Sequence, residues 1–404
     1  MKRVLGFIFI LVSGLVLVAC KGDTSNELKT VSMFGGTDAN RGVYSSTLLE
    51  FQNEHDVIIK DNSSSSDEEW KASVVASFKN GTEPDVLQFF TGEDAKPFVE
   101  AGLVMSIEDI RKEYPEYAKN INPAVLDDYA VPTTGFVEGL FTNTAHFKST
   151  AAKAYLDKDA WTWDEFVDLL EILVEDNKDV PGYAPIAYGV NIPHYWLDHL
   201  PAAALGVNYY EEITGTGGQA KLESALYHLN EIKDYLSLDT TEEISSENFL
   251  KGDYTFQLDG SWFAGRIELE TIEVFPFPSI SDHGTPLLSG FTSGFYITKK
   301  AWDNKDKRDL AVKLVQSLTS TSKLSEFVTV GGGFASDSNA KPSEENDIQV
   351  ALRLLASRTD FNALPLGDSS KSGTYPILVE GQASFVNKQE SIAAAAIKEY
   401  LDGQ

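Results

Sequence analysis

The sequence predicts an α/β protein with more than one domain, and three observations support this prediction. The chain has 404 residues, and domains commonly hold about 100 to 200, so two or three domains are expected. Short strand patterns alternate with amphipathic helix patterns, which is typical of mostly parallel sheets. The clearest strand, residues 254–259, alternates apolar and polar side chains and ends at the turn pair Asp259-Gly260. This alternation predicts one buried face.

The composition is that of an acidic globular protein. Of its residues, 42% are hydrophobic, and the formal net charge is −28. Nucleic acids and anionic membranes attract basic surfaces, so we expect neither to bind here through a basic patch. The sequence lacks a phosphate-binding loop, a zinc-protease motif and a serine-nucleophile motif. We therefore expect no cofactor, no metal and no enzymatic activity.

Residues 1–19 have the pattern of a secretory signal. A basic start precedes an apolar run that is too short for a usual transmembrane helix. The run ends at LVAC, which resembles the lipobox of bacterial lipoproteins, and its Cys20 is the only cysteine of the chain. A single thiol is unusual in an exported protein, and lipidation of Cys20 would explain it. A plain signal peptide with a chance cysteine is the alternative. We expect residues 20–29 to form a polar, lipidated tether.

The first part of the folded chain alternates strands and helices. We expect strands at residues 30–34, 57–60 and 84–90. Helices are expected between and after them, at residues 44–53, 68–80, 94–101 and 107–111.

A capping box marks the next helix. Thr162 and Glu165 stand three residues apart before an apolar run, which predicts a helix over residues 163–176. We interpret Trp161 and Trp163 as structural residues of the core. Later strands are expected at residues 185–188, 274–278 and 295–299, and later helices at residues 194–205, 219–236, 245–251, 307–317, 322–328, 347–357 and 389–401.

Trp262 is the strongest single candidate for ligand binding. It follows the carboxyl end of the 254–259 strand, where ligands lodge in open α/β sheets. We expect Ser261 to cap a helix that begins there. An indole offers a broad apolar face and one N–H, which suits stacking on a sugar ring. A core tryptophan at a strand–helix junction is the alternative, and the residues alone leave both interpretations open.

Several stretches, in order, resemble the sugar-binding family of extracellular solute-binding proteins of ABC importers, which is related to maltose-binding protein. They are LLEFQNEHDVIIK, SFKNGTEPDVLQFF, FVEAGLVMSIEDI, TWDEF, and the pattern F-x-x-G followed by G-x-W that ends at Trp262. The resemblance implies a periplasmic-binding-protein-like fold, with two α/β lobes joined by three crossings. Thr142 and Ala335 depart from it, because the family usually has Tyr and Pro there.

The resemblance also implies the domain limits. Residues 30–134 plus 291–330 would form the first lobe, and residues 135–290 plus 335–404 the second. The crossings would lie near residues 129–134, 286–293 and 331–336. We interpret Gly331, Gly332 and Gly333 as a hinge. A phosphate-binding loop is the rejected alternative, because no Lys-Ser or Lys-Thr pair follows.

Position after a strand or at a crossing, together with the resemblance, gives the candidate binding residues. Candidates for stacking on a sugar are Phe89, Phe90, Trp196, Trp262 and Tyr375. Candidates for binding hydroxyls are Asp38, Arg41, Asp94 and Asp259. Other candidates at crossings or turns are Phe136, Gly260, Gly290, Phe291 and Phe334. Near the start of the 194–205 helix, Tyr195 is the second candidate after Trp196, and we expect one of Phe136 and Glu138 to face the cleft.

Two histidines near the 194–205 helix do not have usual metal-ligand spacing. His194 and His199 are five residues apart, whereas helical ligand pairs are usually four apart. We interpret them as polar residues of the surface or cleft rim, with metal ligation as the alternative.

The expected function is capture of a carbohydrate, an oligosaccharide in our interpretation, and its delivery to the transmembrane subunits of an ABC permease. We expect a monomer that is exported and anchored by lipid on Cys20 to the outer face of the bacterial cytoplasmic membrane. The alternatives are a binder of another solute (a peptide, polyamine or chelate) and an exported glycoside hydrolase, because a carboxylate pair can always be imagined among 61 acidic residues.

Overall fold

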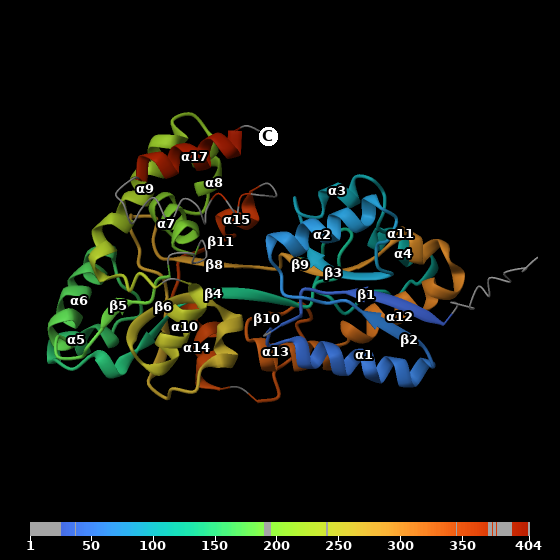
Figure 1. Cartoon of the computed structure of the whole chain (residues 1–404), viewed down its shortest axis with the longest axis horizontal. Helices are drawn as coiled ribbons and strands as arrows, with labels where there is room; N and C mark the ends of the chain where they lie inside the picture. The colour runs from blue at the N-terminus through green and yellow to red at the C-terminus, as the bar shows by residue number, and fades with distance from the viewer. Residues whose placement is uncertain are drawn as a thin grey trace, which may run out of the picture.

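Two separate β-sheets, each covered by helices, form two lobes that lie side by side (Figure 1). The computed structural model describes residues 26–36, 38–189, 195–239, 241–344, 346–370, 374, 377 and 390–402. The predicted signal segment and Cys20 lie outside the described residues. Among the described residues, no helix is long and apolar enough to cross a membrane.

The first lobe is built on a four-stranded sheet. Its strands are β1 (Glu27–Val31), β2 (Ile58–Asp61), β3 (Val86–Phe90) and β9 (Ser293–Ile297). Their order is β2-β1-β3-β9, with β1 parallel to both β2 and β3, and β9 antiparallel to β3. The carboxyl ends of β1 and β3 therefore lie at the same edge of the sheet, which is where a ligand is expected.

Helices cover both faces of the first sheet. The hydrophobic cluster on one face holds residues of α1, α4, α12 and α13, and the cluster on the other face holds residues of α2 and α3. The helices of this lobe are α1 (Arg41–His55), α2 (Glu68–Lys79), α3 (Lys96–Val99), α4 (Ile107–Glu113), α11 (Lys299–Asp303), α12 (Lys305–Leu318) and α13 (Thr321–Gly331).

The second lobe is built on a larger sheet of seven strands. Its main path runs β11-β8-β4-β6-β5, and β7 and β10 also pair with β4. The strands are β4 (Thr134–Asn143), β5 (Ala184–Ile186), β6 (Tyr254–Gly260), β7 (Ile272–Phe275), β8 (Pro286–Gly290), β10 (Phe334–Ala335) and β11 (Phe361–Ala363).

The helices of the second lobe also pack on both faces of its sheet. The larger core cluster includes residues of α5, α6, α7, α8, α9, α15 and α17, and a smaller cluster on the other face includes residues of α10, α14 and η3. These elements are α5 (Thr150–Leu156), α6 (Trp163–Asp176), α7 (Tyr195–Leu205), α8 (Tyr209–Thr214), α9 (Gly218–Ile232), α10 (Glu242–Lys251), α14 (Asp347–Leu354), α15 (Leu366–Ser369), α17 (Glu390–Asp402), and the 3-10 helices η1 (Thr144–His146), η2 (Lys233–Tyr235), η3 (Ser261–Arg266) and η4 (Leu355–Ser357).

The prediction that β6 has one buried face is wrong. All seven residues from Tyr254 to Gly260 are buried. The strand lies inside the sheet between β4 and β5, and helices cover both of its faces. Its polar side chains have hydrogen-bond partners inside the protein: Thr255 Oγ1 bonds with His146 Nδ1 at 3.0 Å, and Gln257 Nε2 donates to Asp259 Oδ2 at 3.2 Å.

Three chain segments connect the two sheets, and they pair with one another. Within the first, Gly135 pairs with Phe334 of the third, and Phe136 pairs with Gly290 of the second. The Ser336 N–H of the third segment also donates to the Thr133 carbonyl at 2.9 Å. The connections therefore form one hydrogen-bonded ribbon with β4 in the middle.

The folded body begins earlier than predicted. Strand β1 starts at Glu27, where it pairs with Ile58 of β2, so residues 27–29 of the expected tether belong to the first sheet. The Lys29 N–H also donates to Asp85 Oδ2 at 2.8 Å. Neighbouring strand partners override the polar local sequence here, and any tether ends before Glu27.

Candidate functional site

Trp262 lies at the carboxyl end of β6 and keeps an exposed ring. It is the second residue of η3, and 39% of its surface is exposed. The preceding Gly260 makes this position possible, because a Cβ atom there would lie 2.2 Å from Trp262 Cζ2. The indole therefore packs directly over the backbone of Gly260. Ser261 does not cap this element as expected; its Oγ accepts from the Val137 N–H at 3.4 Å.

Phe136, Tyr195 and Trp262 form an aromatic cluster on the second lobe. The Phe136 ring centroid lies 5.9 Å from that of Trp262. The ring centroid of Tyr195, on α7, lies 6.3 Å from that of Trp262. Tyr195 is buried and Phe136 is half-buried, so they support the more exposed indole. The resulting surface is apolar, broad and fixed by packing, which suits a flat apolar ligand face.

A cavity of about 160 Å³ lies between the lobes, and we call it the interlobe cavity. The first lobe contributes the residues after β3, the second lobe contributes the segment after β11, and the second connection crosses between them. Its lining residues are Phe90, Thr91, Gly92, Glu93, Asp94, Phe291, Thr292, Leu364, Gly367, Asp368 and Ser370. Pockets for small ligands commonly measure about 300 to 1,000 Å³, so a ligand of several rings needs further surface.

The aromatic cluster lies next to the interlobe cavity. A Cβ on Gly290 would lie 2.4 Å from Leu364 Cδ2, which lines the cavity, and 3.7 Å from Phe136 Cε1, which belongs to the cluster. Leu364 and Phe136 therefore flank the same glycine.

The first-lobe side of the cavity carries paired charges. Lys71 Nζ lies 3.0 Å from Asp94 Oδ2 and 4.3 Å from the centre of the Phe90 ring. Lys96 Nζ lies 3.1 Å from Glu93 Oε2. Each carboxylate on this side thus has a lysine partner.

The second-lobe side holds carboxyl groups in a low-dielectric environment. Asp368 is exposed within the cavity, yet surrounding protein raises its pKa to about 6 through desolvation. Behind the cavity, desolvation and the nearby acids hold the pKa values of Glu138 and Asp198 well above their usual range. Burial likewise raises the pKa of Asp259 to about 6, against hydrogen bonds from Gly260, Gln257 and the Trp262 indole that favour its charged form.

Most of the predicted site residues lie around these two features. Phe90, Asp94 and Phe291 line the cavity. Phe136 and Trp262 belong to the aromatic cluster, and Gly260, Gly290 and Asp259 lie directly against it. Of the pair Phe136 and Glu138, Phe136 is the more exposed. Their roles in binding stay predictions.

Three candidates lie apart from the cavity lining. Asp38 accepts from the Asn40 N–H at 2.7 Å, and burial raises its pKa. Arg41, the first residue of α1, donates to the Gly36 carbonyl at 2.9 Å. Phe334 pairs with Gly135 in the third connection. Tyr375 lies outside the described residues.

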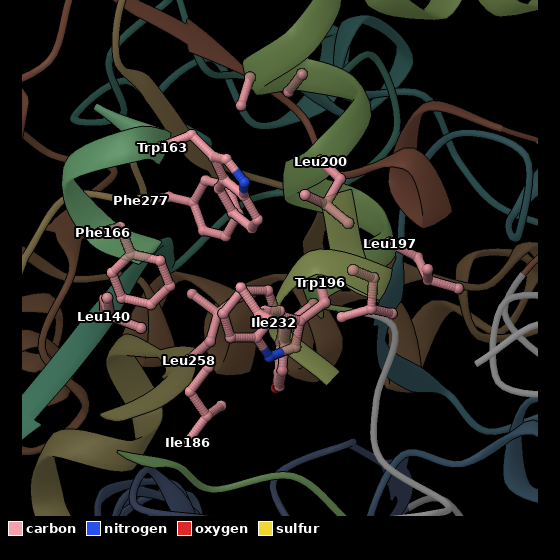
Figure 2. Packing of buried hydrophobic residues seen from close by; sticks show 14 of the residues in the cluster. Leu140, Trp163, Phe166, Ile186, Trp196, Leu197, Leu200, Ile232, Leu258 and Phe277 are labelled. Carbon is pink, nitrogen blue, oxygen red and sulfur yellow. The ribbon is translucent and has the colours of Figure 1, made fainter. Parts of the chain in front are cut away.

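Two expected stacking residues are corrected by the structure. Phe89 is fully buried among Trp70, Phe90 and Phe98, because side chains alternate along β3 and Phe90 takes the outward position. Trp196 is 1% exposed, and Figure 2 shows it enclosed in the larger core of the second lobe. Neither ring offers a face to a ligand, and Tyr195, the second candidate after Trp196, is the residue that contacts Trp262.

The interpretation of His199 as a surface or rim residue is also wrong. Its side chain is buried, Nδ1 lies 2.9 Å from the Tyr195 carbonyl oxygen, and the ring centroid lies 4.7 Å from that of Phe277. Burial lowers its pKa to about 4, so the imidazole is neutral near pH 7. His194 lies outside the described residues. Among the described residues, no cluster of His, Cys, Asp or Glu could hold a metal ion.

Sequence reasoning missed the second-lobe wall of the cavity. This wall includes Leu364, Gly367 and Asp368. The Gly367 N–H donates to Asp198 Oδ1 on α7, 169 residues away, at 3.0 Å. No local pattern marks such a contact. Lys71 was also missed, although its position on α2 before an expected cleft strand is a usable signal.

The raised pKa of Asp259 predicts a pH-dependent stability. An aspartate in the unfolded chain titrates near about pH 4. Between that value and about 6 the folded state binds more protons, so the free energy of unfolding falls as the pH rises. Asp259→Asn should therefore gain stability over the wild type, on the order of 1 kcal/mol, as the pH rises through this window. Urea unfolding measured across the window tests this expectation.

The control for that prediction is Asp282→Asn. Asp282 is exposed on the same lobe, so its variant should follow the pH dependence of the wild type. Parallel stability curves for the wild type and Asp259→Asn would contradict the expected burial effect.

Comparison with known proteins places the chain among binding proteins. Residues 41–323 match the family described as bacterial extracellular solute-binding protein. No curated protein matches the sequence. The two-lobed α/β fold class predicted from the sequence is confirmed by solved structures of the same architecture.

Three of these structures are similar over nearly their full length. A chitin oligosaccharide binding protein is 18% identical, with a TM-score of 0.78 over 93% of this chain and 98% of that chain. The bacterial solute receptor AcbH, described as having an exclusive preference for β-D-galactopyranose, is 15% identical, with a TM-score of 0.73 over 93% and 98%. The maltose/maltodextrin-binding domain MalE from Bdellovibrio bacteriovorus, bound to maltotriose, is 17% identical, with a TM-score of 0.70 over 94% and 99%.

Proposed function

The chain belongs to the bacterial extracellular solute-binding protein family, and from this premise we propose that it captures a carbohydrate between its lobes. The observation that carries the proposal is the aromatic cluster beside the interlobe cavity. Sugar rings have apolar C–H faces, and an exposed indole held by Phe136 and Tyr195 matches such a face.

Polar groups in the cavity suit the hydroxyl rim of a sugar. Asp368, Thr292 and Ser370 line it, and carboxylate and hydroxyl oxygens accept hydrogen bonds from sugar hydroxyls. The chitin-oligosaccharide-binding, β-galactopyranose-preferring and maltotriose-bound structures support a saccharide as the ligand class. An oligosaccharide would use both the cavity and the surface over Leu364.

The two proposed lobes would act together in capture and delivery of the sugar. The lobes would consist of residues 30–134 plus 291–330 and of residues 135–290 plus 335–404, with β1 extending the first lobe to Glu27. Closure of the lobes around the sugar would present one combined surface to the transmembrane subunits of an ABC permease. A lipid on Cys20 would hold this monomer at the outer face of the cytoplasmic membrane.

A polyamine is the second candidate ligand, because acidic side chains line the cavity. Glu93, Asp94 and Asp368 would attract a cation, and the aromatic cluster would pack on its methylene groups. The lysine partners of Glu93 and Asp94 weaken this candidate.

A glycan panel read by thermal unfolding tests the proposed function. A saccharide that binds only the folded state stabilises it by about 2.7 kcal/mol at a concentration of 100 Kd, which raises the midpoint by several degrees. We expect at least one neutral or amino saccharide to do so without release of hydrolysis products. Stabilisation by spermidine or peptides alone would contradict the proposal, and product release would favour a glycoside hydrolase.

A further inference from the structure

The two walls of the interlobe cavity differ in charge balance. On the first lobe, Asp94 pairs with Lys71 at 3.0 Å and Glu93 pairs with Lys96 at 3.1 Å. These two acid–base pairs cancel in charge, although Glu93 and Lys96 are partly exposed. The first-lobe wall is therefore close to neutral for a ligand inside the cavity.

The second-lobe wall carries Asp368, and among the described residues no lysine, arginine or histidine forms an ion pair with it. The side chain is exposed within the cavity, beside Thr292 of the second connection. Lys71 of α2 acts on it across the cavity, but that lysine is already bonded to Asp94. Among the described lining residues, Asp368 is thus the acid without a salt-bridge partner.

No positive charge compensates Asp368 from behind within the described residues. The nearby groups on β4 and α7 are Glu138, Asp198 and His199. Within the described part of the chain, Glu138 Oε2 is buried without a hydrogen-bond partner and lies 3.5 Å from His199 Nδ1, and that imidazole is neutral near pH 7. Asp198 accepts from the Gly367 N–H, next to Asp368 in the chain. Among the described residues, no cation of β4 or α7 therefore offsets the charge of Asp368.

We propose that Asp368 makes the cavity select saccharides by charge, favouring a protonated amino sugar, accepting a neutral ring and rejecting a uronic acid. This inference rests on the proposed function and deepens it. An ammonium group donates a charge-assisted hydrogen bond to a carboxylate, which is about twice as strong as a neutral one. A hydroxyl also donates to the carboxylate, but it carries no positive charge and so lacks the added Coulomb attraction of the ammonium. A uronate carboxylate only accepts, and it would face a charge of the same sign.

Binding of matched sugars to the Asp368→Asn variant tests the inference. The probes are glucosamine, glucose and glucuronate, with galactosamine, galactose and galacturonate as a second set, measured by calorimetry near pH 7 at low salt. In the wild type we expect each amino sugar to bind at least about tenfold more tightly than the matched uronate, a modest Coulomb effect at an effective dielectric constant near 20. The Asn variant should lose most of this ratio, because its affinity for the amino sugar should fall further than its affinity for the neutral sugar.

Glu93→Gln is the matched control. It removes an acid from the same lining, but one that pairs with Lys96 on the partly exposed rim. Its amino-to-uronate ratio should stay within about threefold of the wild type. If Glu93→Gln removes the preference as fully as Asp368→Asn, the assignment to Asp368 is overturned.

A second measurement needs no variant. Lowering the pH from about 7 to about 5 protonates Asp368 while the sugar probes largely keep their charges, so the wild-type preference should shrink. Four other ionisable groups face the same region, namely Asp94, Lys71, Glu138 and Asp198. The pH dependence of binding to the Asp368→Asn variant measures their share of the effect. An unchanged preference at both pH values would contradict the inference.

The outcomes separate the inference from the proposed function. Equal binding of neutral, amino and uronate sugars overturns the charge selection and leaves a carbohydrate-binding protein. Binding of spermidine with no response to any sugar overturns the proposed function, and with it the saccharide preference.

Discussion

Trp262→Ala is expected to weaken saccharide binding by at least about 1 kcal/mol, a roughly fivefold rise in Kd, and by as much as the 2 to 4 kcal/mol of a binding hot spot. The indole is the most exposed member of the aromatic cluster, and its neighbours hold it at 5.9 and 6.3 Å. Truncation removes the flat apolar surface without opening a buried core. Calorimetry with the best sugar of the glycan panel gives the difference directly.

Gly260→Ala provides an independent test of the same surface. The new Cβ would lie 2.2 Å from the Trp262 ring, so the indole must leave its place although its chemistry is unchanged. We expect a loss of affinity in the same direction as for Trp262→Ala. Tyr227→Ala is the control, because Tyr227 is an exposed aromatic residue on α9, outside both the cluster and the cavity lining. Wild-type affinity in a folded Trp262→Ala protein would refute the role of the cluster.

Trp161→Ala is expected to lower the free energy of unfolding by about 3 to 5 kcal/mol, the usual cost of emptying a buried aromatic site. The ring is 1% exposed, stacks on Phe275 with centroids 4.4 Å apart, and packs edge-on against Phe256 at 5.9 Å. Its Nε1 donates to the Tyr155 carbonyl at 3.0 Å, and truncation leaves that oxygen without this donor. Urea unfolding of the purified variant measures the change.

Leu354→Ala is the matched control for the core prediction. Leu354 is 54% exposed at the end of α14, so its truncation should change stability by less than about 0.5 kcal/mol. Trp161 is outside the proposed site, so the Trp161→Ala protein should keep sugar affinity wherever it remains folded. A loss below about 1 kcal/mol would show that the second-lobe core tolerates the cavity.

Local signals explain the elements that the sequence predicted well. Helix α6 spans residues 163–176 as expected, because Thr162 and Glu165 form the predicted capping box with each other's backbone. The expected strand at residues 254–259 is β6 with Gly260 added. Trp161 and Trp163 are buried, as predicted. For α6 the deciding contacts lie within three residues of one another.

Side-chain direction could not be predicted, because distant elements decide it. The period of a strand shows that Phe89 and Phe90 point to opposite faces, but the helices that bury Phe89 come from elsewhere in the chain. The same holds for Tyr195 and Trp196, whose order in the site is the reverse of the expectation. Gly367, next to Asp368, is bonded to Asp198, 169 residues away. The charge of the cavity wall therefore appears only in three dimensions.

The pairing of the three connections has a mechanical consequence. In the first connection, Gly135 pairs with the third connection and Phe136 pairs with the second. The three connections between the lobes therefore cannot bend independently. Gly332 and Gly333, with φ values of 67° and 72°, hold the turn at one margin of this ribbon. Any bending between the two sheets would therefore have to deform all three connections together.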